Sequence, residues 1–357
     1  MPAQKIHLLS STTEEITSLL GELGEKPFRA KQVCDWVYAK RAASFDEMRN
    51  LPKALRKALD ERSALRTLSV ADHAASADGK TEKWLLATPE NHGVEVVLIR
   101  EGARRTACVS SSLGCPLGCA FCASGFGPFL RHLSAGEMVE EAAAIEAASG
   151  ERVTNVVFMG SGEPFLNYDA VLAAARRMNA SPDGLAIGAR HITVSTVGVL
   201  TGIERFAAEP EEFRLAVSLH APSQAVRERL VPSARQWPFD RILAALRRYT
   251  RSTRREVTIE YILIQGLNAS VEDAERLAGR LRGLPCKVNC IPVNPAPEGE
   301  WLPPSLRRCR AFTDRLSECG VRATLRAEKG RDILAACGQL RAYHLAGKGP
   351  AGASGEG

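Results

Sequence analysis

Three cysteines stand at C-x3-C-x2-C spacing in the segment Cys115-Pro-Leu-Gly-Cys119-Ala-Phe-Cys122. The segment directly follows an expected β-strand, and its glycine and proline predict a loop. An iron–sulfur cube usually takes four protein thiolates, so three would leave one iron with an open position for a small chelating molecule. Two simpler interpretations stay open from spacing alone: a zinc site completed by a fourth ligand, and a set of buried thiols.

The cysteine segment lies at the start of a regular alternation of expected strands and helices. One helix is well marked, by a capping box at Ser134 and Glu137 and by Gly150 after its last residue, Ala148. Alternation of this kind favours parallel βαβ units, and six consecutive units suit part of a barrel. We therefore predict an α/β fold with a partial (β/α)6 barrel. The expected strands are Thr106–Ser111, Val153–Met159, Ile192–Thr196, Leu215–His220, Val257–Ile264, Lys287–Val293 and Val321–Arg326.

The chain before the barrel reads as a small helical module followed by a hairpin. Ser11-Thr-Thr-Glu14 has capping-box spacing and precedes an apolar face that includes Ile16 and Leu20. Two short extended stretches, Lys83–Thr88 and Val94–Ile99, follow and predict a hairpin. We expect an N-terminal helical accessory domain over 1–75, a connecting hairpin over 76–100, a catalytic barrel over 101–345 and a flexible tail over 346–357.

Composition places the chain among ordinary globular proteins. Of 357 residues, 45% are hydrophobic and 25% charged, and the net charge is +6, which permits nucleic-acid binding without demonstrating it. No apolar run approaches the ~18 residues of a membrane helix, and the N-terminus is too short in apolar residues for a secretory signal. We therefore expect a cytoplasmic protein whose ten cysteines are not a disulfide framework. Five scattered cysteines are predicted to be buried structural thiols: Cys34, Cys286, Cys290, Cys309 and Cys319.

Polar residues follow four of the expected barrel strands. Residues at the C-terminal ends of parallel barrel strands share one face, which is where barrel enzymes place their sites. Each piece is a weak signal by itself, but together with the cysteines they form a candidate site. The pieces are Gly160-Ser-Gly-Glu163-Pro164, Ser195-Thr-Val-Gly198, Ser218-Leu-His220 and Asn294-Pro295.

Glu95 stands in the middle of an expected strand and shares its side of the pleat with Val97 and Ile99. A carboxylate on an apolar face is either at a wet edge or buried with a raised pKa that suits proton transfer. The sequence leaves both interpretations open.

The ordered motifs resemble the radical SAM (S-adenosylmethionine) superfamily and, within it, the RlmN/Cfr adenosine methyltransferases. The resemblance runs from about Leu8 to Leu340, and Glu163-Pro164 with Gly24-Glu-Lys-Pro is most similar to the RlmN branch. Besides the cysteine segment it is carried by Cys108-Val-Ser-Ser, Met159-Gly-Ser-Gly-Glu-Pro164, Ser195-Thr-Val-Gly198, Ser218-Leu-His-Ala-Pro222, Ala335-Ala-Cys337-Gly-Gln-Leu340, Gly24-Glu-Lys-Pro-Phe-Arg29 and Phe45-Asp-Glu-Met48.

The resemblance implies a radical route to an RNA base. The RlmN branch methylates C2 of one adenosine in 23S rRNA, and often adenosine 37 of tRNA, whereas the Cfr branch methylates C8 of the same rRNA adenosine. It also implies that Cys115, Cys119 and Cys122 hold a [4Fe-4S] cluster. The residues implied to hold SAM are Gly162, Glu163, Ser195, Ser218, Leu219, His220 and Asn294.

The resemblance assigns three further residues to a two-SAM mechanism. Cys337 takes a methyl group from one SAM and becomes S-methylcysteine. A second SAM yields a radical that removes a hydrogen from this methyl group, and the carbon then adds to adenine. Glu95 accepts a proton at the modified carbon, and Cys108 attacks Cys337 to release the product with a transient disulfide.

The implied partners are 23S rRNA before ribosome assembly is complete, possibly tRNA, and a low-potential electron donor such as flavodoxin. We expect a monomer that does not bind membranes. The basic N-terminal helices and the Arg241–Arg255 stretch, with six arginines and no acid, are predicted RNA contacts. The alternative from another class is a zinc-stabilised RNA-binding protein without enzymatic activity.

Overall fold

A computed structural model describes residues 5–295, 301–326, 329–340 and 342–344. Its main feature is one 11-stranded sheet, in which β6, β9, β10, β11, β12, β13 and β14 run parallel in chain order. The sheet is open, because β14 and β3 stand at its two ends and do not pair with each other. The strands are β1 (Ile6–His7), β2 (Ser63–Ala64), β3 (Ser69–Ala75), β4 (Thr81–Ala87), β5 (His92–Glu101), β6 (Arg104–Val109), β7 (Ser112–Leu113), β8 (Arg131–His132), β9 (Asn155–Phe158), β10 (Ile192–Thr196), β11 (Arg214–Ser218), β12 (Val257–Leu263), β13 (Cys286–Pro292), β14 (Arg322–Leu325) and β15 (Ala342–His344).

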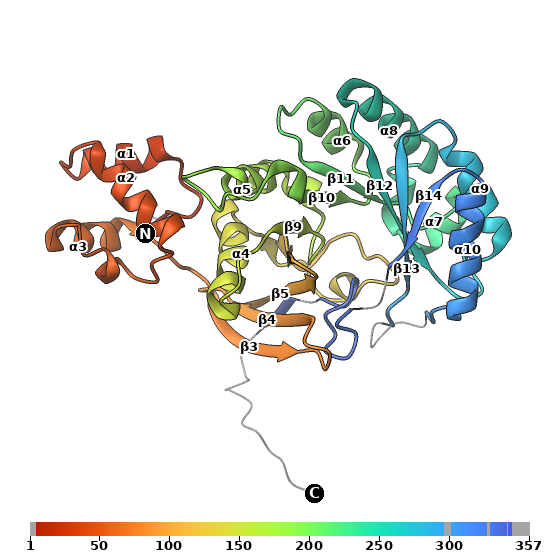
Figure 1. Cartoon of the computed structure of the whole chain (residues 1–357), viewed down its shortest axis with the longest axis horizontal. Helices are drawn as coiled ribbons and strands as arrows, with labels where there is room; N and C mark the ends of the chain where they lie inside the picture. Colours follow the sequence, from red (N-terminus) through yellow and green to blue (C-terminus); the bar gives the residue numbers. More distant parts are fainter. Residues whose placement is uncertain (1–4, 296–300, 327–328, 341, 345–357) are drawn as a thin grey trace, which may run out of the picture.

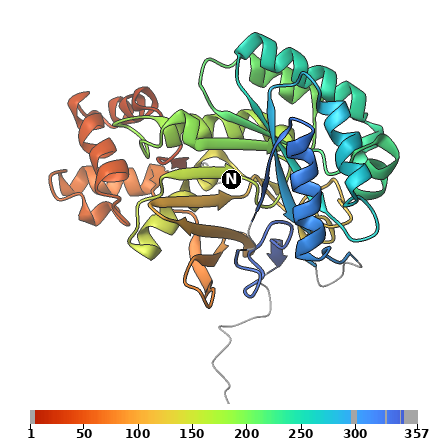
Figure 2. The same ribbon diagram turned by 45° about the vertical axis from the view of Figure 1, so that its right-hand side comes forward.

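Helices connect the parallel strands and follow the outer side of the curved sheet (Figures 1 and 2). The predicted partial barrel is therefore confirmed, with each of the seven expected strands in place. The capping box at Ser134 and Glu137 and the left-handed Gly150 bound α4 as the sequence indicates. The helices are α1 (Thr13–Glu22), α2 (Phe28–Cys34), α3 (Lys53–Arg62), α4 (Ala135–Ser149), α5 (Tyr168–Asn179), α6 (Leu200–Ala207), α7 (Gln224–Leu230), α8 (Phe239–Thr253), α9 (Val271–Leu281) and α10 (Leu306–Glu318).

The N-terminal helices form a separate lobe beside α4 and α5, at the left of Figure 1. Helix α1 begins one residue later than the sequence pattern indicates, because Thr12 is the N-cap and Glu15 completes the capping box. The lobe is held by buried acids of α4. Glu140 accepts hydrogen bonds from the backbone N–H of Thr67 at 2.9 Å, and Glu146 pairs with Arg41 at 2.6 Å.

The expected hairpin is present, and its sheet continues into the barrel. Strand β4 pairs with β5 and β5 pairs with β6, all antiparallel. The expectation that residues 1–75 are helical was wrong at its end, where Ser69–Ala75 forms β3 on the outside of β4. The C-terminal segment returns across the molecule, because β15 pairs with the start of β5. In the described ranges, no helix has the length and apolar character to cross a bilayer.

Candidate active site

The cysteine loop lies at the C-terminal ends of the parallel strands, directly after β6 and β7. Gly114 is required at its start, because its φ is +80° and a Cβ there would stand 2.1 Å from the carbonyl oxygen of Pro128. Two distant segments anchor the loop. The N–H of Ala123 donates to the carbonyl of Gly338 at 2.7 Å, and the indole N–H of Trp301 donates to the carbonyl of Ala120 at 3.1 Å.

A cavity of about 850 Å³, which we call the cysteine cavity, adjoins this loop. Its walls combine the loop cysteines with the ends of β9, β10, β11 and β13. A concave site at the strand ends, with a few polar groups among apolar walls, is typical of small-molecule and cofactor binding. Polar and sulfur-bearing residues that line it include Cys115, Cys119, Cys122, Met159, Gly162, Glu163, Ser195, Thr196, Ser218, His220, Glu260 and Cys337.

Glu163 brings a buried carboxyl group to the cysteine cavity. Its two oxygens accept hydrogen bonds from the backbone N–H groups of Phe165 (3.0 Å) and Val197 (2.8 Å). Burial nevertheless raises the pKa of Glu163 to about 7. Gly162 precedes it at φ +104°, where a Cβ would lie 2.6 Å from Oγ of Ser111. Glycine therefore permits the turn that aims Glu163 into the cavity.

His220 is a neutral donor at the cavity wall. Its Nδ1 accepts a hydrogen bond from the N–H of Ile262 at 3.2 Å, so the neutral ring carries its proton on Nε2. Burial, and to a smaller extent the nearby Arg227, lower the pKa of His220 to about 3. The ring packs edge-on against Phe121 of the cysteine loop, with centroids 4.8 Å apart. His220 thus supports the loop and offers one N–H to a ligand.

Arg227 of α7 is fully buried and fixes the strand ends around the cavity. Its guanidinium donates to the carbonyls of Ser218 (2.8 Å), Leu219 (2.6 Å) and Val197. Burial lowers the pKa of Arg227 to about 10. The sequence analysis missed this residue, because a single arginine in a helix carries no motif. Two of the predicted SAM residues, Leu219 and Asn294, do not line the cysteine cavity.

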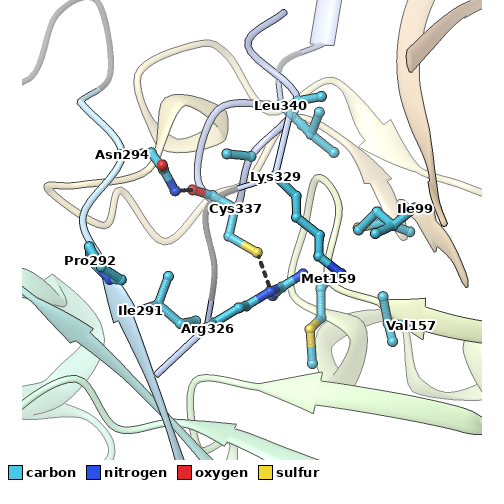
Figure 3. Close-up of a pocket in the computed structure, with 13 residues that line it drawn as sticks. Ile99, Val157, Met159, Ile291, Pro292, Asn294, Arg326, Lys329, Cys337 and Leu340 are labelled. Carbon is cyan, nitrogen blue, oxygen red and sulfur yellow. Dashed lines mark hydrogen bonds between the residues drawn. The ribbon is translucent and has the colours of Figure 1, made fainter. Parts of the chain in front are cut away.

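A second cavity, of about 550 Å³, lies on the other side of Cys337 (Figure 3). We call it the thiol cavity, because Cys108 and Cys337 both line it. Asn294 donates to the carbonyl of Cys337 at 3.2 Å. Three residues line both cavities and mark their boundary: Met159, Ile291 and Cys337.

Arg326 approaches the sulfur of Cys337 from the end of β14. Its Nη1 donates to Cys337 Sγ at 3.0 Å (Figure 3). The sulfur of Cys337, together with Glu260 and Cys108, raises the pKa of Arg326, which keeps the guanidinium charged. The sequence analysis did not find Arg326, because only the fold brings it to Cys337.

Cys108 and Glu95 occupy the same side of neighbouring strands. Cys108 pairs with Val97, and Glu95 lies two residues from Val97 on β5. Cys108 is buried, and burial raises the pKa of its thiol to about 12. Glu95 is also buried, so it does not lie at a wet edge of the sheet. Its carboxylate pairs with Lys83 at 2.7 Å, and Lys83 also donates to the carbonyl of Leu334 at 3.2 Å.

The structure therefore brings most of the predicted residues to two adjoining cavities. All ten cysteines are free thiols, so Cys108 and Cys337 are not joined in this structure, and the transient disulfide expected between them during turnover stays a prediction. Among the five scattered cysteines, Cys34, Cys290 and Cys309 are buried as expected, but Cys286 is half-buried and Cys319 is exposed, which corrects the prediction for these two.

The arginine-rich stretch lies mainly on α8, in the outer layer of helices. Several of its members are engaged within the protein. Arg247 donates to the carbonyl of Arg280 at 2.9 Å, Arg248 pairs with Glu204 at 2.7 Å, and Arg251 donates to the carbonyl of Arg247 at 3.1 Å. The stretch is thus separated from the two cavities, and its predicted role in RNA contact stays a prediction.

Comparisons with known proteins agree with this arrangement of the site. The family model described as "Radical SAM superfamily" matches residues 109–278. A second family model, described as "Ribosomal RNA large subunit methyltransferase N-terminal domain", matches residues 6–65. A "Probable dual-specificity RNA methyltransferase RlmN" of Lysinibacillus sphaericus is 45% identical over 96% of this chain and 90% of its own. The chain belongs to the RlmN family.

Two further relatives agree with this assignment to the RlmN family. The Bacillus subtilis protein with the same name is 43% identical over 94% of this chain and 93% of its own. A crystal structure of a radical SAM methyltransferase from Sphaerobacter thermophilus has a TM-score of 0.91 and 43% identity, and covers 94% of this chain and 99% of that one. The chain is a radical SAM methyltransferase, as the sequence motifs predict.

The radical SAM family implies a [4Fe-4S] cluster held by three cysteines, with SAM. The cysteine cavity fits this pair of groups: three thiols line it, and Glu163 and His220 add polar groups beside them. The side-chain oxygen of Asn294 is buried without a hydrogen-bond partner in the part of the chain that is described. In the same ranges, no three His, Cys, Asp or Glu side chains converge on a point that would hold a single metal ion. A cube does not require such convergence, since each thiolate binds its own iron.

Proposed function

We propose that this protein methylates C2 of an adenosine in 23S rRNA and of adenosine 37 in tRNA, through S-methylcysteine at Cys337 and two molecules of SAM. One observation carries this proposal: Cys337 lies between two cavities and lines both. A methyl group on its sulfur would therefore be accessible to SAM from the cysteine cavity and to the adenine base from the thiol cavity. The RNA specificity rests on the names of the relatives, and these substrates place the activity in the cytoplasm.

We assign the cofactors to the cysteine cavity. Cys115, Cys119 and Cys122 would hold the cluster, and Glu163, at the strand end beside them, suits the amino group of SAM. The remaining contacts to SAM would come from Gly162, Ser195, Ser218 and His220 in this cavity, and from Asn294, which lines the thiol cavity on the other side of Cys337. Bound there, the cluster and SAM supply the methyl group and a radical route to adenine C2, a carbon that has no nucleophilic lone pair.

Cys337 serves as the methyl carrier. Arg326 orients its sulfur at 3.0 Å and places positive charge beside it. Asn294 holds the backbone of the carrier segment at 3.2 Å. The sulfur is thereby kept at the boundary where both SAM and base can reach it.

The thiol cavity receives the adenine, with Cys108 in its wall and Glu95 on the neighbouring strand β5, outside its lining. Its walls are largely apolar, as expected for a base extracted from its stack. We assign Glu95 as the proton acceptor at the modified carbon, and its pairing with Lys83 keeps the carboxylate in place. Cys108 resolves the covalent intermediate by attack on the sulfur of Cys337, so a disulfide would form only at the end of each turnover.

The N-terminal helices supply the second RNA contact. They expose basic side chains toward solvent and one large aromatic ring, that of Phe28. Phosphate contacts of this kind give affinity but no sequence information. The exposed basic residues of this lobe include Lys26, Lys31, Lys40, Arg49, Lys53 and Lys57.

The test is nucleoside mass spectrometry of 23S rRNA and tRNA after anaerobic treatment with reconstituted protein, SAM and a reductant. We expect 2-methyladenosine in both RNAs. Formation of 8-methyladenosine would instead place the protein in the Cfr branch, and methylation of rRNA alone would remove tRNA from the proposal.

Metal analysis of the same preparation tests the alternative without enzymatic activity. About four irons with sulfide per chain support the assigned cluster. One zinc without sulfide would support a structural zinc site instead. Replacement of Cys115, Cys119 or Cys122 by alanine should remove the iron, whereas replacement of the exposed Cys319 should leave it bound.

A further inference from the structure

An exposed apolar pair lies next to the cysteine loop. Leu302 and Leu306 are 61% and 57% exposed, and they flank the start of α10. They are the two most exposed large apolar side chains among the described residues. A contiguous exposed apolar patch marks an interaction site. Neither leucine lines the cysteine cavity or the thiol cavity.

This surface connects directly to the loop that carries the three cysteines. Trp301, the neighbour of Leu302, donates its indole N–H to the carbonyl of Ala120, between Cys119 and Cys122 in the sequence. The N–H of Gln265 donates to the carbonyl of Leu302 at 2.9 Å. Trp301 and Leu267 pack on one apolar cluster with Cys119, Phe121 and Cys122. A partner seated on Leu302 would thus be separated from the loop by little more than one indole ring.

The same surface carries three arginines. They lie within residues 301–313, and Glu298, Glu300 and Asp314 flank this stretch in the sequence. Arg307, Arg308 and Arg310 are exposed, and within the described ranges none of their guanidinium groups forms an ion pair or hydrogen bond. A hollow of about 950 Å³ adjoins them and is lined by Leu267, Pro304 and Arg308, among others. We call residues 301–310 with this hollow the arginine–leucine surface.

We propose that the arginine–leucine surface is the docking site for an acidic flavoprotein that carries one electron at low potential. The exposed leucines fit the apolar edge of a flavin, and the unpaired arginines fit the acidic surface around it. In the step served, the flavin hydroquinone loses one electron and becomes a semiquinone, the cluster gains that electron, and no heavy atom is transferred. This inference rests on the proposed function, because it needs a cluster at Cys115, Cys119 and Cys122.

RNA is the less suitable occupant of this surface. Nucleic-acid contacts are built from phosphate-binding groups and from aromatic rings that stack on bases. The arginine–leucine surface offers two aliphatic side chains in place of exposed aromatic rings. An electron donor also has a reason to be next to the cysteine loop, whereas the RNA must reach the thiol cavity on the other side of Cys337.

Two double variants test the docking site on the full-length, reconstituted protein. R307E/R308E reverses charge, and L302S/L306S removes the apolar contact. The matched control is R241E/R254E, since Arg241 and Arg254 are exposed arginines of the α8 region away from the cysteine loop. The first readout is the dissociation constant for oxidised flavodoxin by biolayer interferometry at low and moderate salt. The second is the rate of SAM cleavage with limiting reduced flavodoxin and, separately, with dithionite.

We expect both surface variants to bind flavodoxin roughly tenfold or more weakly, and R307E/R308E to lose most of the salt dependence. Their flavodoxin-driven SAM cleavage should fall by a similar factor, while dithionite-driven cleavage stays within about twofold of the parent. The control variant should match the parent in all readouts. Dithionite bypasses the surface, so loss of its signal would indicate failure of the proposed cluster site and not of docking.

Unchanged flavodoxin binding in both variants would overturn the proposal. So would weaker binding of 23S rRNA fragments with normal flavodoxin binding, which would make the surface an RNA contact. Selective loss of binding to a ferredoxin, with no measurable flavodoxin binding by the parent, would also contradict the flavoprotein assignment.

Discussion

The guanidinium Nη1 of Arg326 lies 3.0 Å from the sulfur of Cys337 and donates a hydrogen bond to it. Arg326 is itself fixed by the fold, because its N–H donates to the carbonyl of Cys290 at 2.9 Å, at the end of β14. The carrier sulfur is therefore held by a charged group that belongs to the barrel and not to the segment that carries Cys337. This relationship gives Cys337 a fixed place between the cysteine cavity and the thiol cavity.

Loss of this contact should reduce methylation of Cys337. We predict that Arg326→Met lowers the rate of methyl transfer to Cys337 by roughly 10- to 100-fold, the equivalent of one charge-assisted hydrogen bond. Arg326→Lys should recover part of the rate, since it keeps the charge without the planar fork. The measurement is mass spectrometry of the Cys337 peptide after incubation with SAM, with Arg322→Met as the control on the exposed side of the same strand. Full methylation in Arg326→Met would show that the contact does not position the sulfur.

The reactivity of Cys108 should show an unusual pH dependence. Burial raises the pKa of its thiol to about 12, so the reactive thiolate is scarce at neutral pH and increases about tenfold with each pH unit. We expect its alkylation by iodoacetamide to increase in this way from pH 7 to 10 without a plateau. Peptide mass spectrometry of the native protein measures the rate, with exposed Cys319 as the internal reference. A plateau below pH 9 would show that Cys108 is already a ready nucleophile.

Gly162 should tolerate no side chain. A Cβ there would lie 2.6 Å from Oγ of Ser111, and its φ of +104° is strained for any other residue. We predict that Gly162→Ala lowers the free energy of unfolding by about 2 kcal/mol and weakens SAM binding. The control is Gly279→Ala in α9, where no atom lies within 4 Å of the added Cβ and helix propensity adds about 0.5–1 kcal/mol. Denaturant unfolding and SAM titration give the two values, and equal effects at both glycines would refute the steric argument.

Arg227 should be important for stability as well as for the site. Arg227→Met leaves the carbonyls of Ser218, Leu219 and Val197 without their donor, and we predict a loss of about 3 kcal/mol of unfolding free energy. Arg229→Met, on the exposed side of α7, should change it by less than about 0.5 kcal/mol. Denaturant unfolding compares the two variants. Similar small losses in both would mean that the buried guanidinium does not hold the strand ends.

Local signals explain how much of the fold could be predicted from sequence. The bounds of α4 could be predicted because they depend on residues close together in the sequence. A capping box at Ser134 and Glu137 begins the helix, and the left-handed Gly150 ends it. Strand β3 was missed because Ser69–Ala75 is an exposed edge strand, held by its pairing with β4 and not by its own composition. The N-cap of α1 was misplaced by one residue, because Ser11 with Glu14 and Thr12 with Glu15 have the same capping-box spacing.

The residues of the candidate site also fall into two groups: those that lie in sequence motifs and those that only the fold brings to the site. The three loop cysteines and Glu163 lie in short motifs that a reader of the sequence can find. Arg326 and Arg227 act only through contacts that the folded chain creates, so no sequence motif identifies them as site residues. Leu219 shows the opposite case, in which a residue belongs to a motif but its side chain is buried away from the cavity.

The most direct test of the central claim is mass spectrometry of the Cys108→Ala protein after incubation with SAM, reductant and a 23S rRNA fragment. If Cys337 carries the transferred carbon and Cys108 resolves the intermediate, a covalent protein–RNA adduct should accumulate on a denaturing gel. Nuclease and protease digestion should then place the adenosine on Cys337 through one added carbon. Free 2-methyladenosine formed at the parent rate, with no nucleotide attached to Cys337, would contradict the carrier role.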